Sequence, residues 1–166
     1  MRISVLGATG MVGREVVAEA LSRGHAVTAV SRRPTDLALR GRLAVQRRDL
    51  TDRSTWIELS DVDVAVLTVR LAAGDEELLG PLTGRVLDAA ASSGTRVVVV
   101  GGAAPLLSPH GADLLVADDP AFVPEAWRAV AAASLAQLEA CRRHAYEAWT
   151  YVSPPAHLEP GPRTGL

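Results

Sequence analysis

Three glycines near the N-terminus form the pattern in this sequence that points most directly to chemistry. Gly7, Gly10 and Gly13 follow the apolar run at 3–6 and open a helical pattern at 11–23. In a strand–turn–helix unit, the first glycine permits a tight turn, the second lets the backbone approach a pyrophosphate, and the third lets the helix pack closely. The helix N-terminus also attracts phosphate oxygens. The spacing predicts a dinucleotide-binding loop, with a merely glycine-rich turn as the alternative.

The residues after the second predicted strand indicate the type of dinucleotide. Ser31, Arg32 and Arg33 follow that strand, and no acidic residue accompanies them. At about 20 residues beyond the glycines, an acid would bind the ribose 2'-hydroxyl, whereas an arginine would accept a 2'-phosphate. Ser31 offers a further hydrogen-bond donor, and guanidinium groups match phosphate oxygens well. We therefore expect NADP(H) rather than NAD(H); the alternative is that both arginines only keep a loop soluble.

The third predicted strand ends before Arg47 and Arg48, and Asp49 and Leu50 then turn the chain away from it. In a parallel sheet this turn lies at the same edge as the glycines, where the adenine of a dinucleotide would rest. Two alternatives stay open. Asp49 is a common turn residue, and the two arginines would serve equally as solvated surface groups.

Short β-type runs alternate with helical patterns along the whole chain. This alternation is typical of a three-layer α/β fold around a doubly wound parallel sheet of the Rossmann type. Asp52 or Ser54 would cap the second helix, Pro81 and Pro124 suit first helical turns, and Gly94 suits a helix end. We expect strands at 3–6, 26–30, 43–46, 62–69, 96–100 and 149–152, and helices at 11–23, 54–59, 82–92 and 125–144.

The composition limits the class of protein. Its 166 residues predict a single domain over residues 1–166. No apolar run approaches the roughly 20 residues of a membrane span, and the N-terminus lacks the pattern of a signal peptide. We therefore expect no membrane partner and a cytoplasmic location. Cys141 is the only cysteine, and its alanine-rich helical surroundings favour an inert, buried thiol.

The formal net charge is −2, but the arginines are unevenly distributed. Residues 1–48 hold nine arginines and three acidic residues, whereas residues 49–166 hold eight arginines and sixteen acidic residues. Positive charge therefore gathers where the cofactor phosphates are expected. No basic run is longer than two and aromatic residues are few, which argues against a nucleic-acid-binding surface.

Residues 103–124 contain four prolines and predict a long irregular loop after the strand at 96–100. Loops of this length are often functional. This one leaves the carboxyl end of a strand, and ligands of doubly wound folds bind outside the carboxyl ends of the strands. We therefore expect the loop to contribute to a ligand site.

Several motifs together resemble a known family over the whole chain. The resemblance is to the atypical short-chain dehydrogenase/reductase group, and more closely to its NmrA-like and biliverdin-reductase-B-like NAD(P)H-binding members. The motifs are Gly-Ala-Thr-Gly-Met-Val-Gly at 7–13, Ser-Arg-Arg-Pro at 31–34, Arg-Asp-Leu-Thr-Asp at 48–52, Val-Val-Val-Val-Gly-Gly-Ala at 97–103, Trp-Thr-Tyr-Val-Ser-Pro-Pro at 149–155 and Pro-Gly-Pro-Arg-Thr-Gly at 160–165.

The resemblance implies a Rossmann fold that binds NADP(H) across the switch point between the first and fourth strands. It also implies roles for individual residues. The pyrophosphate loop would comprise Gly7, Thr9, Gly10, Met11 and Val12; Arg32 would bind the 2'-phosphate; Asp49 and Leu50 would lie at the adenine; Thr68, Val69, Gly101 and Gly102 would approach the nicotinamide; and Ser153, Pro154 and Pro155 would flank the pocket.

The chain departs from this resemblance in ways that affect its chemistry. It contains no lysine, so the Tyr–Lys pair of the main short-chain dehydrogenase mechanism cannot form, and arginine cannot replace the lysine because it stays protonated. Ala104-Pro105 stands where relatives often carry Gly-Ser, which removes a hydroxyl near the expected nicotinamide. Relatives also run on past 165. We therefore expect a short or absent C-terminal substrate segment, whether the chain is truncated or naturally short, and a strand at 149–152 that could join two copies.

Chemistry without the tyrosine–lysine pair is still feasible. Hydride delivery to a flavin or quinone leaves charge on a delocalised ring that solvent can protonate. Tyr151, Ser108, His110 and His157 could still donate a proton, but the two histidines fit solvated loops and Tyr151 fits a packing role. We expect no metal site and no serine hydrolase site, because neither spacing occurs.

Two functions therefore stay open. One is an NADPH-dependent reductase of a flat conjugated acceptor, and the other is a non-catalytic NADP(H)-binding redox sensor or interaction protein. The sequence identifies neither the small-molecule substrate nor a catalytic residue.

Overall fold

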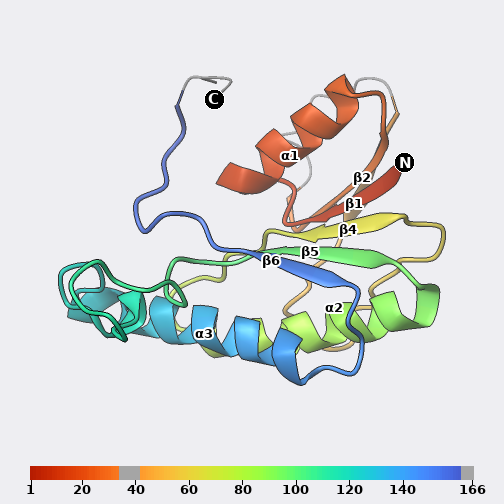
Figure 1. Ribbon diagram of the computed structural model, residues 1–166. Helices are drawn as coiled ribbons and strands as arrows, with labels where there is room; N and C mark the ends of the chain where they lie inside the picture. Colours follow the sequence, from red (N-terminus) through yellow and green to blue (C-terminus); the bar gives the residue numbers. More distant parts are fainter. Residues whose placement is uncertain (34–41, 162–166) are drawn as a thin grey trace.

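The computed structural model describes residues 1–33 and 42–161. These residues build a parallel sheet with the strand order β3-β2-β1-β4-β5-β6 (Figure 1). This order confirms the predicted single-domain, doubly wound fold of the Rossmann type. The strands are β1 (Arg2–Leu6), β2 (Ala26–Ser31), β3 (Leu43–Arg47), β4 (Val64–Leu67), β5 (Arg96–Val100) and β6 (Trp149–Val152).

Helices cover both faces of the sheet. Helix α1 (Met11–Ser22) lies on one face, and α2 (Leu79–Ser93) and α3 (Arg128–Arg143) lie on the other (Figure 1). Successive strand residues point to opposite faces, so Val5 packs in the core under α1 while Leu6 packs in the core that faces α2. The two cores together hold the sheet between its helices.

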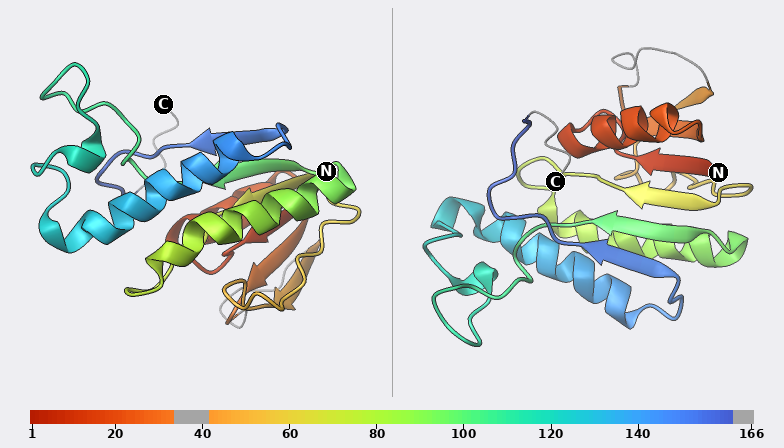
Figure 2. Two further views of the ribbon diagram at one scale, coloured as in Figure 1. Left: turned by 90° about the horizontal axis from the view of Figure 1, so that it is seen from below. Right: turned by 45° about the horizontal axis from the view of Figure 1, so that its top comes forward.

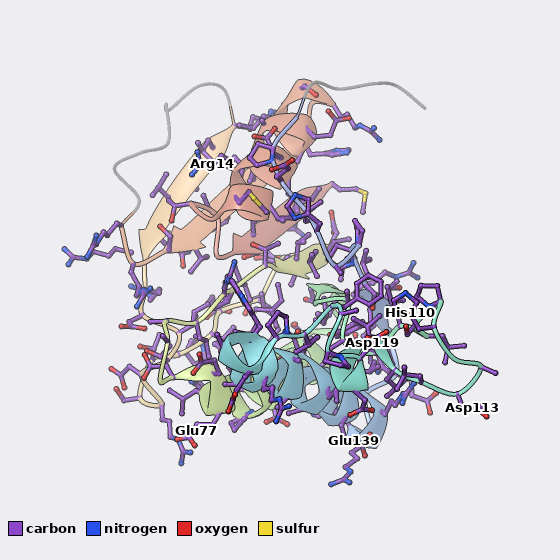
Figure 3. All side chains as sticks on the ribbon, turned by 90° about the vertical axis from the view of Figure 1, so that its left-hand side faces the viewer. Arg14, Glu77, His110, Asp113, Asp119 and Glu139 are labelled. Carbon is purple, nitrogen blue, oxygen red and sulfur yellow. The ribbon has the colours of Figure 1, made fainter. Side chains whose placement is uncertain are left out.

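The topology places the switch point of the sheet between β1 and β4. After β1 the chain crosses to α1 on one face, and after β4 it crosses to α2 on the other. Because every strand pair is parallel, all carboxyl ends lie at one edge of the sheet, which faces the viewer in Figure 3. Ligands of doubly wound folds bind at this edge, at the switch point.

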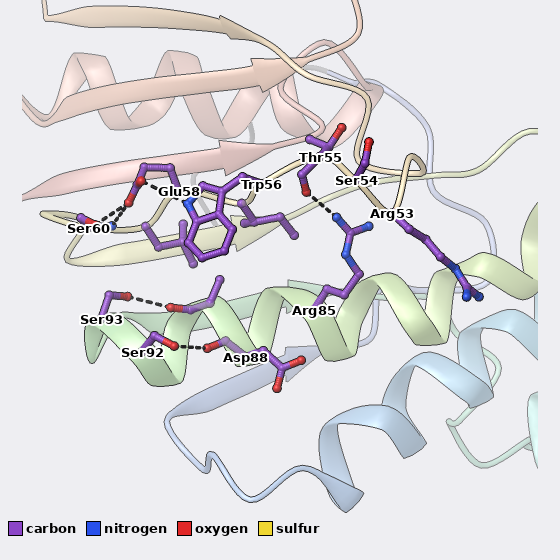
Figure 4. A pocket seen from close by; sticks show the side chains of 13 residues that line it. Arg53, Ser54, Thr55, Trp56, Glu58, Ser60, Arg85, Asp88, Ser92 and Ser93 are labelled. Carbon is purple, nitrogen blue, oxygen red and sulfur yellow. Dashed lines mark hydrogen bonds between the residues drawn. The ribbon is translucent and has the colours of Figure 1, made fainter.

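The predicted helix at 54–59 does not form, and this prediction was wrong. The Asp52 carboxylate accepts hydrogen bonds from the N–H (2.8 Å) and hydroxyl (2.7 Å) of Ser54. The Glu58 carboxylate accepts from the N–H and hydroxyl of Ser60 in the same way, as Figure 4 shows. Such local side-chain bonds compete with helix formation. Ile57 and Leu59 are buried in alternation with the exposed Trp56 and Glu58, so the segment covers the core without forming a helix.

Other element boundaries differ by a few residues from those predicted. Helix α2 begins at Leu79, after a 3₁₀ turn at Glu76–Leu78, and so places Pro81 in its first turn. Gly94, at φ +71°, ends α2 in the left-handed conformation that glycine favours. Strand β4 is shorter than the predicted 62–69 run, and α3 follows a second 3₁₀ turn, Glu125–Trp127, that Pro124 precedes.

The predicted loop at 103–124 is irregular and packed. A single antiparallel bridge joins Leu107 to Leu115, and a 3₁₀ turn spans Val116–Asp118. A small core ties the loop to α3 through Ala104, Val116, Val123 and Ala131. The loop projects beyond the carboxyl end of β5, beside the start of α3 (Figure 2). Within residues 1–33 and 42–161, no helix has the length and apolarity needed to cross a membrane.

Candidate functional site

The turn after β1 is tight, and the structure requires glycine at its first position. Gly7 has φ +92°, and its N–H and that of Ala8 both donate to the Val30 carbonyl, at 2.9 and 3.1 Å. A Cβ at residue 7 would lie 3.0 Å from backbone and side-chain atoms of Thr68. Strain and crowding therefore both favour glycine.

Gly10 and Gly13 bring the start of α1 onto this turn. Gly10 is the N-cap of α1, and no side chain caps the helix. A Cβ on Gly13 would lie 2.2 Å from the Gly7 carbonyl oxygen, and one on Gly10 would lie 3.2 Å from it. The predicted roles of a tight turn and close helix packing are thus visible in the backbone.

The N-terminus of α1 has the electrostatics of an anion site. Its first turn contains no acidic residue and receives no side-chain cap, so its N–H groups remain available to a ligand. Thr9 is half-buried, and Met11 is 40% exposed. These features fit a pyrophosphate bound across the glycine loop.

Arg14 belongs to the same loop surface, although the sequence analysis did not single it out. Its guanidinium donates long hydrogen bonds of 3.4 Å to the carbonyl oxygens of Thr9 and Gly10. Figure 3 shows the side chain beside α1 at the carboxyl edge. The signal for this role in the sequence was an arginine directly after the third glycine. Arg14 entered the prediction only as one of the nine arginines of residues 1–48.

Thr68 supports the glycine loop from β4. Its hydroxyl donates to the carbonyl oxygens of Leu6 (3.1 Å) and Gly7 (3.2 Å). Val69 is half-buried against the core that faces α2. The structure therefore shows Thr68 as a residue that positions the loop, and approach of Thr68 and Val69 to a nicotinamide stays a prediction.

The residues after β2 include one buried and two exposed side chains. Ser31 is 6% exposed, and its hydroxyl has no hydrogen-bond partner among the described residues. Ser31 shares strand parity with Val27 and Ala29, so it lies on the α1 face. Arg32 and Arg33 are exposed at the strand end.

The turn after β3 is stabilised by its own side chains. Asp49 accepts hydrogen bonds from the hydroxyl (2.6 Å) and N–H (3.0 Å) of Thr51. These two bonds, with a smaller contribution from the charge of Arg32, hold the pKa of Asp49 below its usual value. Leu50 is buried in the core and its carbonyl accepts from Arg85. The turn role of Asp49 is therefore visible, and contact with an adenine stays a prediction.

Gly101 and Gly102 are crowded by other parts of the protein. A Cβ at Gly101 would lie 1.9 Å from the Tyr151 hydroxyl oxygen, and a Cβ at Gly102 would lie 2.9 Å from Ser134 Oγ. Gly102 N–H donates to Ser134 Oγ at 3.2 Å. The glycines therefore let β5 turn beneath Tyr151 and against α3.

The Tyr151 hydroxyl is engaged inside the protein. It donates to the Ser134 carbonyl at 3.1 Å and lies 3.2 Å from Ser134 Oγ. Burial raises the pKa of Tyr151 above its usual value. This arrangement agrees with the predicted packing role, and none of the described residues that influence the Tyr151 pKa is a cation.

The predicted site residues share one edge of the sheet. Each group directly follows the carboxyl end of a strand, and Ser153 and Pro154, both half-buried, follow β6.

A cavity of about 350 Å³ lies away from this edge, between segment 53–60 and α2 (Figure 4). Cys141 is buried, which raises its pKa to about 11, as expected for an inert thiol. Among the described residues, no group of three His, Cys, Asp or Glu side chains is placed to hold a metal.

Comparison with known proteins identifies the group to which this site belongs. The chain is 31% identical to the uncharacterized protein YwnB of Bacillus subtilis, over 99% of this chain and 77% of YwnB. Its fold is similar to that of SP1627 of Streptococcus pneumoniae, a proposed NADH-flavin reductase, with a TM-score of 0.85, 28% identity, and coverage of 99% of this chain and 77% of SP1627.

A proposed epimerase from Bacteroides thetaiotaomicron is also similar, with a TM-score of 0.82 and 27% identity over 99% of this chain and 76% of the epimerase. These neighbours confirm the resemblance to atypical short-chain dehydrogenase/reductase proteins. A sequence model of the NAD(P)H-binding family matches residues 7–166, which include the whole glycine loop and every strand-end residue described above. The chain therefore belongs to the NAD(P)H-binding family.

Proposed function

We propose that the protein is an NADPH-dependent reductase of a flat conjugated acceptor of the flavin or quinone type. The observation that carries the proposal is the uncapped N-terminus of α1 behind a glycine loop, in a chain without a tyrosine–lysine pair. Similarity to SP1627, a proposed NADH-flavin reductase, supports the reaction class.

The preference for NADP(H) over NAD(H) rests on the end of β2. Arg32 and Arg33 are exposed there, next to the buried, unpartnered hydroxyl of Ser31. No acidic side chain follows this strand directly, so a 2'-phosphate would meet guanidinium donors at the strand end. Arg14 would add a contact to the pyrophosphate, because its present bonds at 3.4 Å are weak.

The acceptor class follows from the groups that surround the expected nicotinamide position. A bound nicotinamide cofactor supplies a hydride. The protein contributes orientation through the loops after β4, β5 and β6, while the Tyr151 hydroxyl is already engaged with Ser134. Acceptors whose reduced ring delocalises the charge require the least assistance from a proton donor of the protein.

Turnover with defined acceptors tests this proposal. NADPH oxidation would be followed with FMN and with a soluble naphthoquinone, using the parent and Gly10→Val. Sustained oxidation by the parent that is lost in Gly10→Val would support the reductase. Tight NADPH binding without turnover of either acceptor would instead support the second candidate, a non-catalytic redox sensor, for which the engaged Tyr151 hydroxyl is the favouring observation.

We also propose self-association through β6 and a cytoplasmic location. Strand β6 pairs only with β5 in the described sheet, and Thr150 and Val152 are exposed. An unpaired edge strand can pair with a second chain. Sedimentation velocity would compare the parent with Val152→Lys: a concentration-dependent dimer that the lysine disrupts supports the proposal, and a monomeric parent overturns it.

A further inference from the structure

The loop at 103–124 contains a histidine and a buried aspartate that contact each other and are not part of the glycine loop. Asp119 is buried, with 4% of its side chain exposed, and its Oδ2 lies 2.9 Å from His110 Nδ1. Asp119 Oδ2 also accepts a hydrogen bond from the Ser108 hydroxyl, and Oδ1 accepts one from the Ala121 N–H at 2.9 Å. The carboxylate is thus held from several directions.

Asp119 determines which nitrogen of His110 carries a proton. The Ser108 hydroxyl and the Ala121 N–H hold the pKa of Asp119 below its usual value, so the carboxylate is ionised and can only accept. His110 Nδ1 must therefore be the donor. In the neutral ring Nε2 then has a free lone pair, and in the charged ring Nε2 carries a proton that it can give away.

The orientation of the His110 ring is also restrained. It stacks on Phe122 with ring centroids 5.5 Å apart, and its backbone N–H donates to Ser108 Oγ at 3.1 Å. Nevertheless 57% of the side chain is exposed, and Nε2 has no hydrogen-bond partner among the described residues. A restrained ring with one nitrogen held by a carboxylate and the other open is an arrangement suited to proton transfer.

The cluster is not a serine hydrolase triad. In such a triad the histidine links the serine to the acid, whereas here Ser108 and His110 both bond directly to Asp119. Ser108 is also buried, with 5% of its surface exposed. Ser108 therefore positions the carboxylate and is not a nucleophile.

The position of the cluster relates it to the proposed reductase site. Its loop leaves Gly102 at the carboxyl end of β5, and Figure 3 shows His110 and Asp119 at this edge, on the side of β5 and β6. The resemblance places the nicotinamide on that half of the sheet. An acceptor there would be bordered by the loop that carries the imidazole oriented by Asp119.

We infer that His110 is the general acid of this site, oriented by Asp119, and that the acceptors include conjugated aldehydes or ketones as well as flavins and quinones. This inference rests on the proposed NADPH-dependent reductase function. A bound nicotinamide cofactor would supply the hydride for a new C–H bond at the carbonyl carbon, and the C=O π pair would move to oxygen. The Nε2–H of protonated His110 gives its proton to that oxygen. The products are the alcohol, the oxidised cofactor and neutral His110 with its proton on Nδ1.

The first test compares acceptors that differ in their need for a proton donor. The ratio of kcat for an aromatic aldehyde to kcat for FMN would be measured in the parent, His110→Gln and Asp119→Asn. General acids contribute about 10²- to 10⁴-fold, so His110→Gln should lower the ratio at least about a hundredfold. His25→Gln is the matched control, because His25 precedes β2 at the opposite edge of the sheet. A parent that reduces FMN but not the aldehyde, or an unchanged ratio in His110→Gln, would overturn the inference while leaving the reductase proposal intact.

The second test does not depend on turnover. Nitrogen-15 NMR of the parent should show that the neutral form of His110 carries its proton on Nδ1, and Asp119→Asn should shift the population toward the Nε2–H tautomer. Asp119→Glu should restore part of the Nδ1–H population. A parent with the proton on Nε2, or a tautomer insensitive to Asp119, would show that the carboxylate does not orient the ring and would contradict the inference. Absence of all NADPH oxidation would instead overturn the proposed function itself.

Discussion

Tyr151 lies directly over Gly101, so that a Cβ added to the glycine would be 1.9 Å from the tyrosine hydroxyl oxygen. Gly101 N–H also donates to the Val152 carbonyl at 3.0 Å, which fixes the end of β5 against β6. The side chain and the backbone are therefore locked together at the carboxyl edge of the sheet.

Gly101→Ala should destabilise the protein, because the ring of Tyr151 is packed and hydrogen-bonded and cannot move freely. Overpacking of this kind costs about 1–3 kcal/mol. Gly84→Ala is the matched control: nothing lies within 4 Å of the added Cβ, and residue 84 is inside α2, so the helix should gain up to about 1 kcal/mol. Urea unfolding measures both. Equal stabilities for the two variants would contradict the packing described.

Gly10→Val should abolish NADPH binding while the fold persists. The added side chain would stand at the N-cap of α1, where its Cβ would lie 3.2 Å from the Gly7 carbonyl oxygen. It would displace the loop from a pyrophosphate. We expect affinity to fall at least about a hundredfold, or about 2.8 kcal/mol. Calorimetric titration measures the affinity and far-UV circular dichroism the fold. NADPH affinity equal to the parent's would refute the role of the loop.

Cys141 should not react with a thiol reagent in the folded protein. Burial raises its pKa to about 11, so the nucleophilic thiolate is scarce at pH 8. Reaction with Ellman's reagent should release the colour of one thiol in urea and almost none in buffer. Rapid labelling of the native protein would show that α3 does not hold this residue in the core.

Acid should reveal the contribution of Asp119 to stability. Its pKa is lowered by the hydrogen bonds of Ser108 and Ala121, so the ionised carboxylate stabilises the fold above the ordinary value of 3.8, and this stabilisation is lost as pH falls through the lowered pKa. The parent should therefore exceed Asp119→Asn in stability near neutrality, and the difference should shrink in acid. Thermal unfolding across pH provides the measurement, and a difference independent of pH would be inconsistent with this view.

The regular parts of the fold were predictable because their signals are local. Runs of β-branched residues mark β2 and β5, and Gly94 marks the end of α2 in the conformation that its φ of +71° requires. The helix predicted at 54–59 failed because the carboxylates of Asp52 and Glu58 bond to N–H groups two residues further on. Apolar spacing carries no record of that competition.

The candidate site was predictable to a similar extent. The glycine spacing lies in one short segment, so its geometry followed from the sequence. His110 was expected to be a solvated loop residue, and its side chain is indeed 57% exposed; the contact with Asp119, nine residues away in an irregular loop, was not foreseen. No periodic pattern connects such residues. Arg14 was overlooked because a helical arginine is usually a surface residue, and only the coordinates place it over Thr9 and Gly10.

The central claim is that this chain binds NADP(H) through the glycine loop and the arginines after β2. Calorimetric titration of the parent, Arg32→Ala and the control Arg143→Ala with NADPH and with NADH tests it most directly. Charge-assisted hydrogen bonds contribute about 1.5–3 kcal/mol, so NADPH should bind the parent at least about tenfold more tightly than NADH. Arg32→Ala should remove most of that preference, and Arg143→Ala, at the end of α3, should keep it. Equal affinities for the two cofactors in the parent, or no binding of either, would contradict the account.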